Sequence, residues 1–287
     1  MSFCLKLRAG LAAETRRVAF EELTTAVERL RSGDIHQTRR SLKQVRALLD
    51  LAHDDFARNQ SQLFRDAARR LAATRDREVS LRVLTELGET RFRPERALFR
   101  QARAALGSRA GLGKSASAVA LRSLESALVS LADWTPNVSI KSFEQRLRRS
   151  WRRGRRAVQA AKLSLNQLVD SGVPAGGGAG NPEDLHELRK CIKLLWAQLR
   201  LLRRCRPGLM KKLIREADGI AELLGDEHDL AILNQRLSKA RVLAKLGPLA
   251  GFLVQRRAEL GHKAVARAEC FFEEKPRRFA RRIFSKT

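Results

Sequence analysis

The sequence has few of the residues on which several common protein classes depend. It contains no tyrosine, and its four cysteines, Cys4, Cys191, Cys205 and Cys270, include no C-x-x-C pair. Such scattered cysteines argue against a zinc module or a disulfide framework and indicate a reducing compartment, in which all four would be small core residues. No apolar run approaches the roughly 18 residues that a membrane span requires. These absences favour a soluble, cytoplasmic protein that does not interact with membranes.

Acidic residues are also scarce, and their scarcity restricts the kind of partner that the protein can bind. There are 31 Asp and Glu against 58 Lys and Arg, so the chain of 287 residues carries a formal charge of +27. Forty-four of the cations are arginine, whose planar guanidinium grips a phosphate or carboxylate through two parallel hydrogen bonds. The composition therefore predicts a polyanionic partner, and the 44% of hydrophobic residues excludes a disordered chain.

Strand patterns are missing as well, because no convincing alternation with a period of two occurs anywhere in the sequence. Apolar residues instead recur at helical spacing, as in Phe20, Leu23, Val27 and Leu30. Glycine and proline are concentrated at a few sites, which separate about ten such segments. We therefore expect an all-α fold, built as a helical bundle.

One helical segment occurs twice. The segment DIHQTRRSLKQVRALLDL at 34–51 aligns with DLHELRKCIKLLWAQLRL at 184–201, at an offset of 150 residues. A weaker match follows each copy and pairs Asp76 with Asp229 once three residues are inserted. The sequence thus predicts two copies of one helical unit, residues 1–136 and residues 137–287, which together form one domain divided near Pro136.

Each copy of the repeated helix is predicted to have an apolar face and a cationic face. At 100° per residue, the cationic face of the first copy contains His36, Arg39, Arg40, Lys43 and Arg46. The corresponding face of the second copy contains His186, Arg189, Lys190, Lys193 and Arg200. A solvated helix face is the alternative interpretation, but such faces usually mix charges of both signs, and the five residues of the first copy's face include no acid. The repetition therefore favours a binding role.

The start of each repeated helix supports this interpretation. Asp34 is a predicted N-cap of the first copy, and Asn181, followed by Pro182, is a predicted N-cap of the second. Each histidine would then lie within the first turns of its helix, where free N–H groups and the helix dipole favour an anion.

Two further groups of cations lie outside the repeated helix. In the segment RLRRSWRRGRRAV at 146–158, four arginines fall on one side of a helix and would line a shared groove, namely Arg148, Arg152, Arg155 and Arg156, whereas Arg149 and Arg153 are expected in solvent. In the C-terminal segment FFEEKPRRFARRIF, a helix that starts at proline would add Lys275, Arg278 and Arg282. A solvated tail is an equally consistent interpretation of that last segment.

With these motifs the chain resembles the CHAD domain family of histidine-containing helical domains. The resemblance covers nearly the whole chain and rests on the two copies of H-x-x-R-[RK]-x-x-K, on the Arg75-Asp76 and His228-Asp229 segments that follow them, and on the ending FFEEKPRRFARR. It implies two pseudo-symmetric helical bundles around a basic central cavity that binds inorganic polyphosphate. One departure is Trp196, which stands where Arg46 predicts a cation, so the halves are expected to contribute unequally.

The composition agrees with what the resemblance implies. Polyphosphate has no bases, so it matches a groove of Arg, Lys and His donors and gains nothing from exposed aromatic platforms. We therefore expect non-enzymatic polyphosphate binding without a cofactor or metal, and targeting to polyphosphate granules is one role that such binding would serve. Nonspecific binding to the backbone of DNA or RNA is the first alternative. A metal-dependent phosphohydrolase built on His186 and His228-Asp229 is the second, although the neighbouring cations would repel a divalent metal.

The paired histidines also predict a pH dependence. A bound polyanion stabilises an imidazolium, so binding would raise the pKa of His36 and His186. Affinity would then increase as the pH falls through the range in which histidine titrates.

Overall fold

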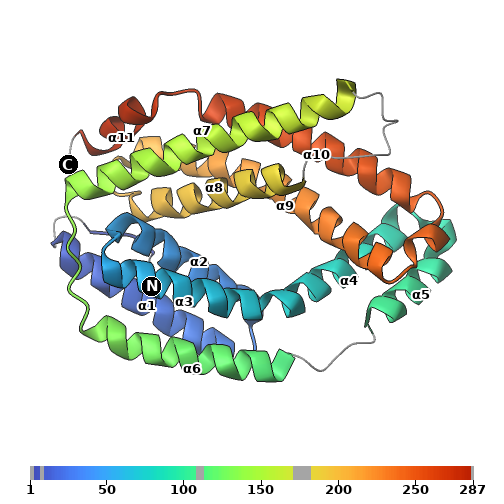
Figure 1. Cartoon of the computed structure of the whole chain (residues 1–287), viewed down its shortest axis with the longest axis horizontal. Coiled ribbons are helices and arrows are strands. Elements are labelled where there is room, and N and C mark those ends of the chain that lie inside the picture. Colours follow the sequence, from blue (N-terminus) through green and yellow to red (C-terminus); the bar gives the residue numbers. More distant parts are fainter. Residues whose placement is uncertain (1–2, 7–9, 108–112, 171–181, 286–287) are drawn as a thin grey trace.

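The chain is almost entirely helical. The structure, a computed structural model, describes residues 3–6, 10–107, 113–170 and 182–285, of which it describes only the backbone at 73–75, 113–114, 167–170 and 182. Within these residues the all-α prediction is confirmed, because only helices, turns and connecting segments occur (Figure 1). The α-helices are α1 (Leu11–Arg31), α2 (Ile35–Ala52), α3 (Asp55–Arg70), α4 (Ala72–Thr90), α5 (Arg96–Gly107), α6 (Gly113–Ala132), α7 (Ile140–Asp170), α8 (Pro182–Leu201), α9 (Pro207–Lys239), α10 (Leu249–Phe271) and α11 (Pro276–Phe284). The short 3₁₀-helices are η2 (Arg93–Glu95) and η3 (Leu243–Leu246). None of the helices described combines the length and the apolar character that crossing a lipid bilayer requires.

Local capping explains where the helices near the repeated motif begin. The Asp34 carboxylate accepts a hydrogen bond from the Gln37 N–H at 3.0 Å, which confirms Asp34 as the N-cap of α2. Asp54 caps α3 in the same manner. Pro182 is the first residue of α8, whereas Asn181, the predicted cap of that helix, lies outside the described residues.

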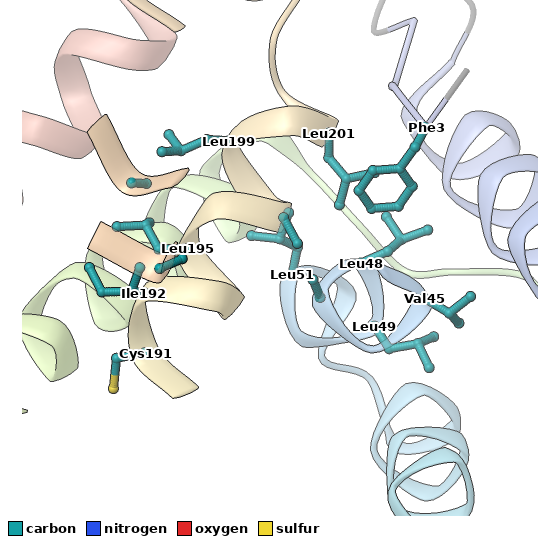
Figure 2. Packing of buried hydrophobic residues seen from close by; sticks show 14 of the residues in the cluster. Phe3, Val45, Leu48, Leu49, Leu51, Cys191, Ile192, Leu195, Leu199 and Leu201 are labelled. Carbon is teal, nitrogen blue, oxygen red and sulfur yellow. The ribbon is translucent and has the colours of Figure 1, made fainter. Parts of the chain in front are cut away.

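The apolar faces of α2 and α8 form the centre of the main hydrophobic core. Leu42, Val45 and Leu49 of α2 are almost completely buried, as are Ile192 and Leu195 of α8. Figure 2 shows Leu48, Leu51 and Leu201 where the two helices meet, with Phe3 beside them. Val45 and Leu49 point from α2 away from α8, and Ile192 and Leu195 lie on the side of α8 away from α2. Burying a leucine or valine side chain contributes about 1.5–3 kcal/mol. The packing thus fixes the opposite, cationic faces of both helices relative to one another.

A second, smaller core lies at the far end of the molecule. It is formed by α4, α5, the second half of α9 and the first half of α10, with Leu84, Phe99, Leu233 and Leu253 among its buried residues. In Figure 1 this end lies to the right, whereas α6 and α7 run along opposite long sides. Both cores take residues from before and after Pro136, which lies in the connection between α6 and α7.

The two copies of the repeated unit differ in how their helices continue. In the first copy, α3 ends at Arg70 and α4 begins at Ala72, so the chain bends at Leu71. The residues that align with α3 and α4 in the second copy belong to one helix of 33 residues, α9. At 1.5 Å per residue this helix is about 50 Å long. It therefore runs from the main core into the smaller one.

The cysteines only partly follow the expectation that all four are core residues. Cys4 and Cys191 are buried and Cys205 is half-buried, but Cys270 is exposed, so the expectation is wrong for Cys270. That residue lies on α10 beside the buried Phe271 but points away from the core. All four thiols are free.

Candidate functional site

A cavity of about 490 Å³ lies between α2, α4, α8 and α9, and we call it the four-helix cavity. In Figure 1 these four helices surround the middle of the molecule. Its charged lining has two sides. Helices α2 and α8 contribute every lysine and arginine, namely Arg39, Arg40, Lys43, Arg189 and Lys193. Helices α4 and α9 contribute every carboxylate, namely Asp76, Asp218, Glu222, Asp226 and Asp229.

The spacing of the repeated motif places its cations on the cavity side of each helix. In α8, Arg189 and Lys193 lie four residues apart and so project from neighbouring turns of one face. Arg39 and Lys43 hold the equivalent positions in α2. The two copies act on one another, since Lys193 and Arg189 are among the charges that lower the pKa of Lys43. The structure thus brings these arginines and lysines of both motifs to one cavity.

Most of these cations have no internal counterion. Among the residues that the structure describes, no carboxylate lies within 4 Å of the charged group of Arg40, Lys43, Arg189 or Lys193. The Nε of Arg189 is buried and has no hydrogen-bond partner in the same set of residues. Arg39 differs, because its guanidinium donates to the carbonyl oxygen of Ala68. An anion in the cavity would supply the partners that the other four lack.

Desolvation, together with repulsion between like charges, lowers the pKa of both cavity lysines. Desolvation, followed by repulsion from Lys193 and Arg189, lowers the pKa of Lys43 to about 7. Desolvation and Arg189 lower the pKa of Lys193 to about 8, although Asp229 and Asp218 act in the opposite direction. The Lys43 side chain is nevertheless exposed, because it lines the open cavity. Near neutral pH these lysines are therefore close to losing their protons.

Three of the five histidines lie in or beside the four-helix cavity, and their environments differ. His36 is exposed and lines the cavity. His186 does not line it, and its ring stacks on that of His228 with centroids 4.9 Å apart. Desolvation and the charge of Lys190 lower the pKa of His186. His228 does line the cavity, and desolvation and the charge of Arg189 lower its pKa to about 3. His186 and His228 are therefore mainly uncharged at neutral pH.

Three further residues of the predicted cationic faces lie away from the cavity. Lys190 forms an ion pair with Glu187, three residues earlier in α8. Arg46 is half-buried, and desolvation lowers its pKa. The guanidinium of Arg200 lies 4.7 Å from the centroid of the Trp196 ring. Trp196 itself lines the cavity, at the position where the first copy has Arg46.

The structure does not bring the cations of the other two segments to this cavity. Arg148, Arg152, Arg155 and Arg156 lie on α7, which packs against α8, α10 and α11, and they are not part of the lining. Lys275, Arg278 and Arg282 line a separate hollow at α11. Helical periodicity shows which residues share a face, but not which neighbour that face meets. Of the two arginines expected in solvent, Arg149 is exposed, while Arg153 is exposed and paired with Glu187.

The acidic side of the cavity did not emerge from the sequence. Asp218, Glu222, Asp226 and Asp229 recur at intervals of four, four and three residues, which is the spacing of one helical stripe. That spacing was a usable signal, but only the fold shows that the stripe faces α2 and α8. Among the described residues, no group of three or more His, Cys, Asp and Glu side chains is arranged to hold a metal ion.

Comparison with known proteins gives the family. The model of the CHAD domain family matches residues 14–238, which is most of the chain, so the protein belongs to the CHAD domain family. The matched range includes all four helices of the cavity and excludes α10 and α11. Comparisons with curated proteins and with solved structures gave no match.

Proposed function

We propose that this protein binds inorganic polyphosphate in the four-helix cavity and does not hydrolyse it. CHAD domains are known to bind polyphosphate. The observation that carries the proposal is the set of cavity cations without an internal counterion, Arg40, Lys43, Arg189 and Lys193. A charge-assisted hydrogen bond from each to a phosphate oxygen would contribute about 1.5–3 kcal/mol.

The two-sided lining favours a slim ligand over a thick one. A single phosphate chain along α2 and α8 would meet the cations and keep away from the carboxylates of α9. A nucleic acid duplex has a major groove that alone is about 12 Å wide, so it cannot enter a cavity of about 490 Å³. Duplex DNA or RNA would therefore reach only the outer arginines.

We also propose that the two repeats, residues 1–136 and 137–287, act as pseudo-symmetric halves around this cavity. Arg39 and Lys43 come from the first repeat and Arg189 and Lys193 from the second, at equivalent positions. A polyphosphate chain in the cavity would then be held from both halves. Such a protein would associate with polyphosphate granules in the cytoplasm.

A competition experiment tests the ligand. Purified protein is mixed with labelled long-chain polyphosphate at physiological salt, and unlabelled polyphosphate or duplex DNA is added at equal charge concentration. We expect polyphosphate to displace the label at a lower concentration than DNA, and the affinity for polyphosphate to fall steeply with added salt. Stronger displacement by DNA would replace the proposal with nonspecific binding to a nucleic acid backbone.

A hydrolysis assay tests the second part of the proposal. The protein is incubated with polyphosphate and Mg²⁺, Mn²⁺ or Zn²⁺, and released phosphate is measured. We expect no release, because Arg189 and Lys193 beside the His186–His228 pair disfavour a bound divalent cation. Release that disappears in the His228→Ala and Asp229→Asn variants would support the phosphohydrolase alternative.

A further inference from the structure

A second concentration of cations lies at the C-terminal helix, apart from the four-helix cavity. A hollow of about 620 Å³ is lined by Lys275, Arg277, Arg278, Arg281, Arg282 and Ser285, and we call it the α11 hollow. No carboxylate belongs to this lining, whereas the four-helix cavity has as many carboxylates as lysines and arginines. All the charged side chains that line the α11 hollow are therefore cations.

Helix α11 is held firmly on the body of the protein. The Phe279 ring stacks on Trp151 of α7 with centroids 3.5 Å apart, and the Trp151 Nε1 donates to the Glu274 carbonyl oxygen at 2.8 Å. At the other end of the helix, Arg206 donates to the carbonyl oxygen of Arg282 at 2.8 Å. The segment is thus a packed helix rather than a tail, and the backbone that carries its exposed cations is fixed on the protein.

Internal ion pairs account for only part of this charge. Glu274 pairs with Arg278 at 3.5 Å and with Arg282 at 2.8 Å. Arg277 and Arg281 are exposed, lie one turn apart, and have no carboxylate within 4 Å among the described residues. Like charges at this spacing destabilise a helix.

Helix electrostatics do not explain these cations either. Lys275 is the N-cap of α11, and Arg277 and Arg278 belong to its first turn. Cations at that end oppose the helix dipole, which favours negative charge at an N-terminus. Only Arg281 and Arg282, in the last turn, are placed favourably. The sequence therefore accepts a local electrostatic cost, and a bound anion would remove it.

We propose that the α11 hollow is a second polyphosphate-binding site, which acts independently of the four-helix cavity. One protein molecule would then hold two segments of polyphosphate and could bridge two polyphosphate molecules. A lipid surface is a poorer candidate, because Phe279, Ile283 and Phe284 of α11 are buried in the protein and cannot enter a bilayer. The proposal depends on the proposed function for the identity of the ligand, but α11 lies outside the range matched by the family model.

Calorimetric titration with short-chain polyphosphate tests the second site. We expect two binding sites in the parent protein and one in the Arg277→Glu/Arg281→Glu variant. The control is Arg96→Glu/Arg100→Glu, which reverses two exposed arginines at the same spacing on α5, at the opposite end of the molecule (Figure 1), and should keep two sites. Arg277→Gln/Arg281→Gln serves as the milder variant if charge reversal alters the circular dichroism.

The same titration separates this proposal from the proposed function. A cavity variant, Arg39→Glu/Arg40→Glu/Lys43→Glu, should keep one site, the one at α11. If the parent has a single site that only the cavity variant removes, the α11 proposal fails and the proposed function stands. If only the α11 variants lose binding, the cavity is not the site of the proposed function. Loss of one binding site in the α5 control as well would overturn the α11 proposal. So would an α11 site that binds duplex DNA more tightly than polyphosphate at equal charge concentration.

With long-chain polyphosphate, two independent sites should produce cross-linked assemblies. Light scattering should therefore rise when the parent protein and the long chains are mixed near charge balance, and it should rise much less for Arg277→Glu/Arg281→Glu than for the α5 control. Equal scattering from the two variants would contradict bridging through α11.

Discussion

The two copies of the repeated helix carry the same motif but leave different cations available. Arg40 of α2 lines the four-helix cavity, whereas the equivalent Lys190 of α8 is paired with Glu187. The first copy has Gln37 at the position of Glu187, so Arg40 has no acid three residues before it. One residue of the preceding turn thus distinguishes a motif cation that lines the cavity from one that has an internal partner.

The largest effect on polyphosphate affinity is expected when the three cations of either copy are reversed. Reversing the three cations of one copy removes several charge-assisted hydrogen bonds and adds repulsion, so polyphosphate affinity measured by titration should fall about a hundredfold or more. The α2 set should have the greater effect, because Lys190 is already paired. The two variants are Arg39→Glu/Arg40→Glu/Lys43→Glu and Arg189→Glu/Lys190→Glu/Lys193→Glu.

The control for these variants reverses three exposed arginines of α5, Arg96, Arg100 and Arg103. Arg153 is unsuitable as a control because it pairs with Glu187. Circular dichroism should be unchanged in all three proteins, since none of the altered side chains belongs to either hydrophobic core. A similar loss of affinity in the control would mean that net charge alone governs binding.

The next largest effect is the pH dependence of polyphosphate affinity. It shows whether Lys43 and Lys193, rather than the histidines, take up protons on binding. The pKa of Lys43 is about 7 and that of Lys193 about 8 in the free protein, and a bound polyanion would raise both. Proton uptake on binding means that affinity falls as the pH rises above these values, by about tenfold between pH 7 and pH 9. Lys43→Arg/Lys193→Arg keeps the charge without titrating, so its affinity should be flatter over that range and higher than that of the parent at pH 9. A parent profile that is already flat would show that neither lysine takes up a proton when the ligand binds.

A smaller effect tests Arg40 against Lys190 directly. Arg40→Ala should weaken polyphosphate binding about fivefold, equivalent to ~1 kcal/mol, whereas Lys190→Ala should change it less than about twofold. Glu187→Gln would release Lys190 and Arg153 and should slightly strengthen binding. Equal effects of the two alanine variants would show that the Glu187 pair does not hold Lys190 away from the ligand.

The smallest effect concerns the two histidines. His36 lines the cavity, whereas His186 is half-buried against His228 and has a lowered pKa. At pH 8, His186→Gln should therefore leave polyphosphate affinity within about twofold of the parent, since an uncharged imidazole is replaced by another neutral group. His36→Gln should have the larger effect, because it alters a side chain of the cavity lining. The reverse order, measured in one titration series, would require His186 to reach the ligand.

The sequence was sufficient to predict those parts of the four-helix cavity that depend on the geometry of a single helix. Periodicity placed Arg39, Lys43, Arg189 and Lys193 on the helix faces that line the cavity, and the preference of aspartate for N-caps identified Asp34. These predictions succeed because a helix fixes the angle between residues that are close in sequence.

The sequence was insufficient where contacts join distant segments. The acidic stripe of α9 became part of the site only because α9 packs against α8 and faces α2 across the cavity, and the arginines of α7 are not part of the lining. The pairing of Arg153 with Glu187 likewise depends on how α7 meets α8. In contrast, the Glu187–Lys190 pair lies within one turn at i, i+3 spacing, so it could have been predicted from the sequence, although Lys190 was assigned to the binding face.

The balanced lining of the four-helix cavity has a consequence for rates. Its five lysines and arginines and its five carboxylates cancel formally, so nearly all of the +27 charge lies elsewhere on the protein. A distant polyanion is therefore attracted by the outer surface, and the rate of first encounter should depend strongly on ionic strength. Escape is governed by short-range hydrogen bonds inside the cavity, which salt screens less. Added salt should accordingly slow capture of the ligand far more than it speeds release.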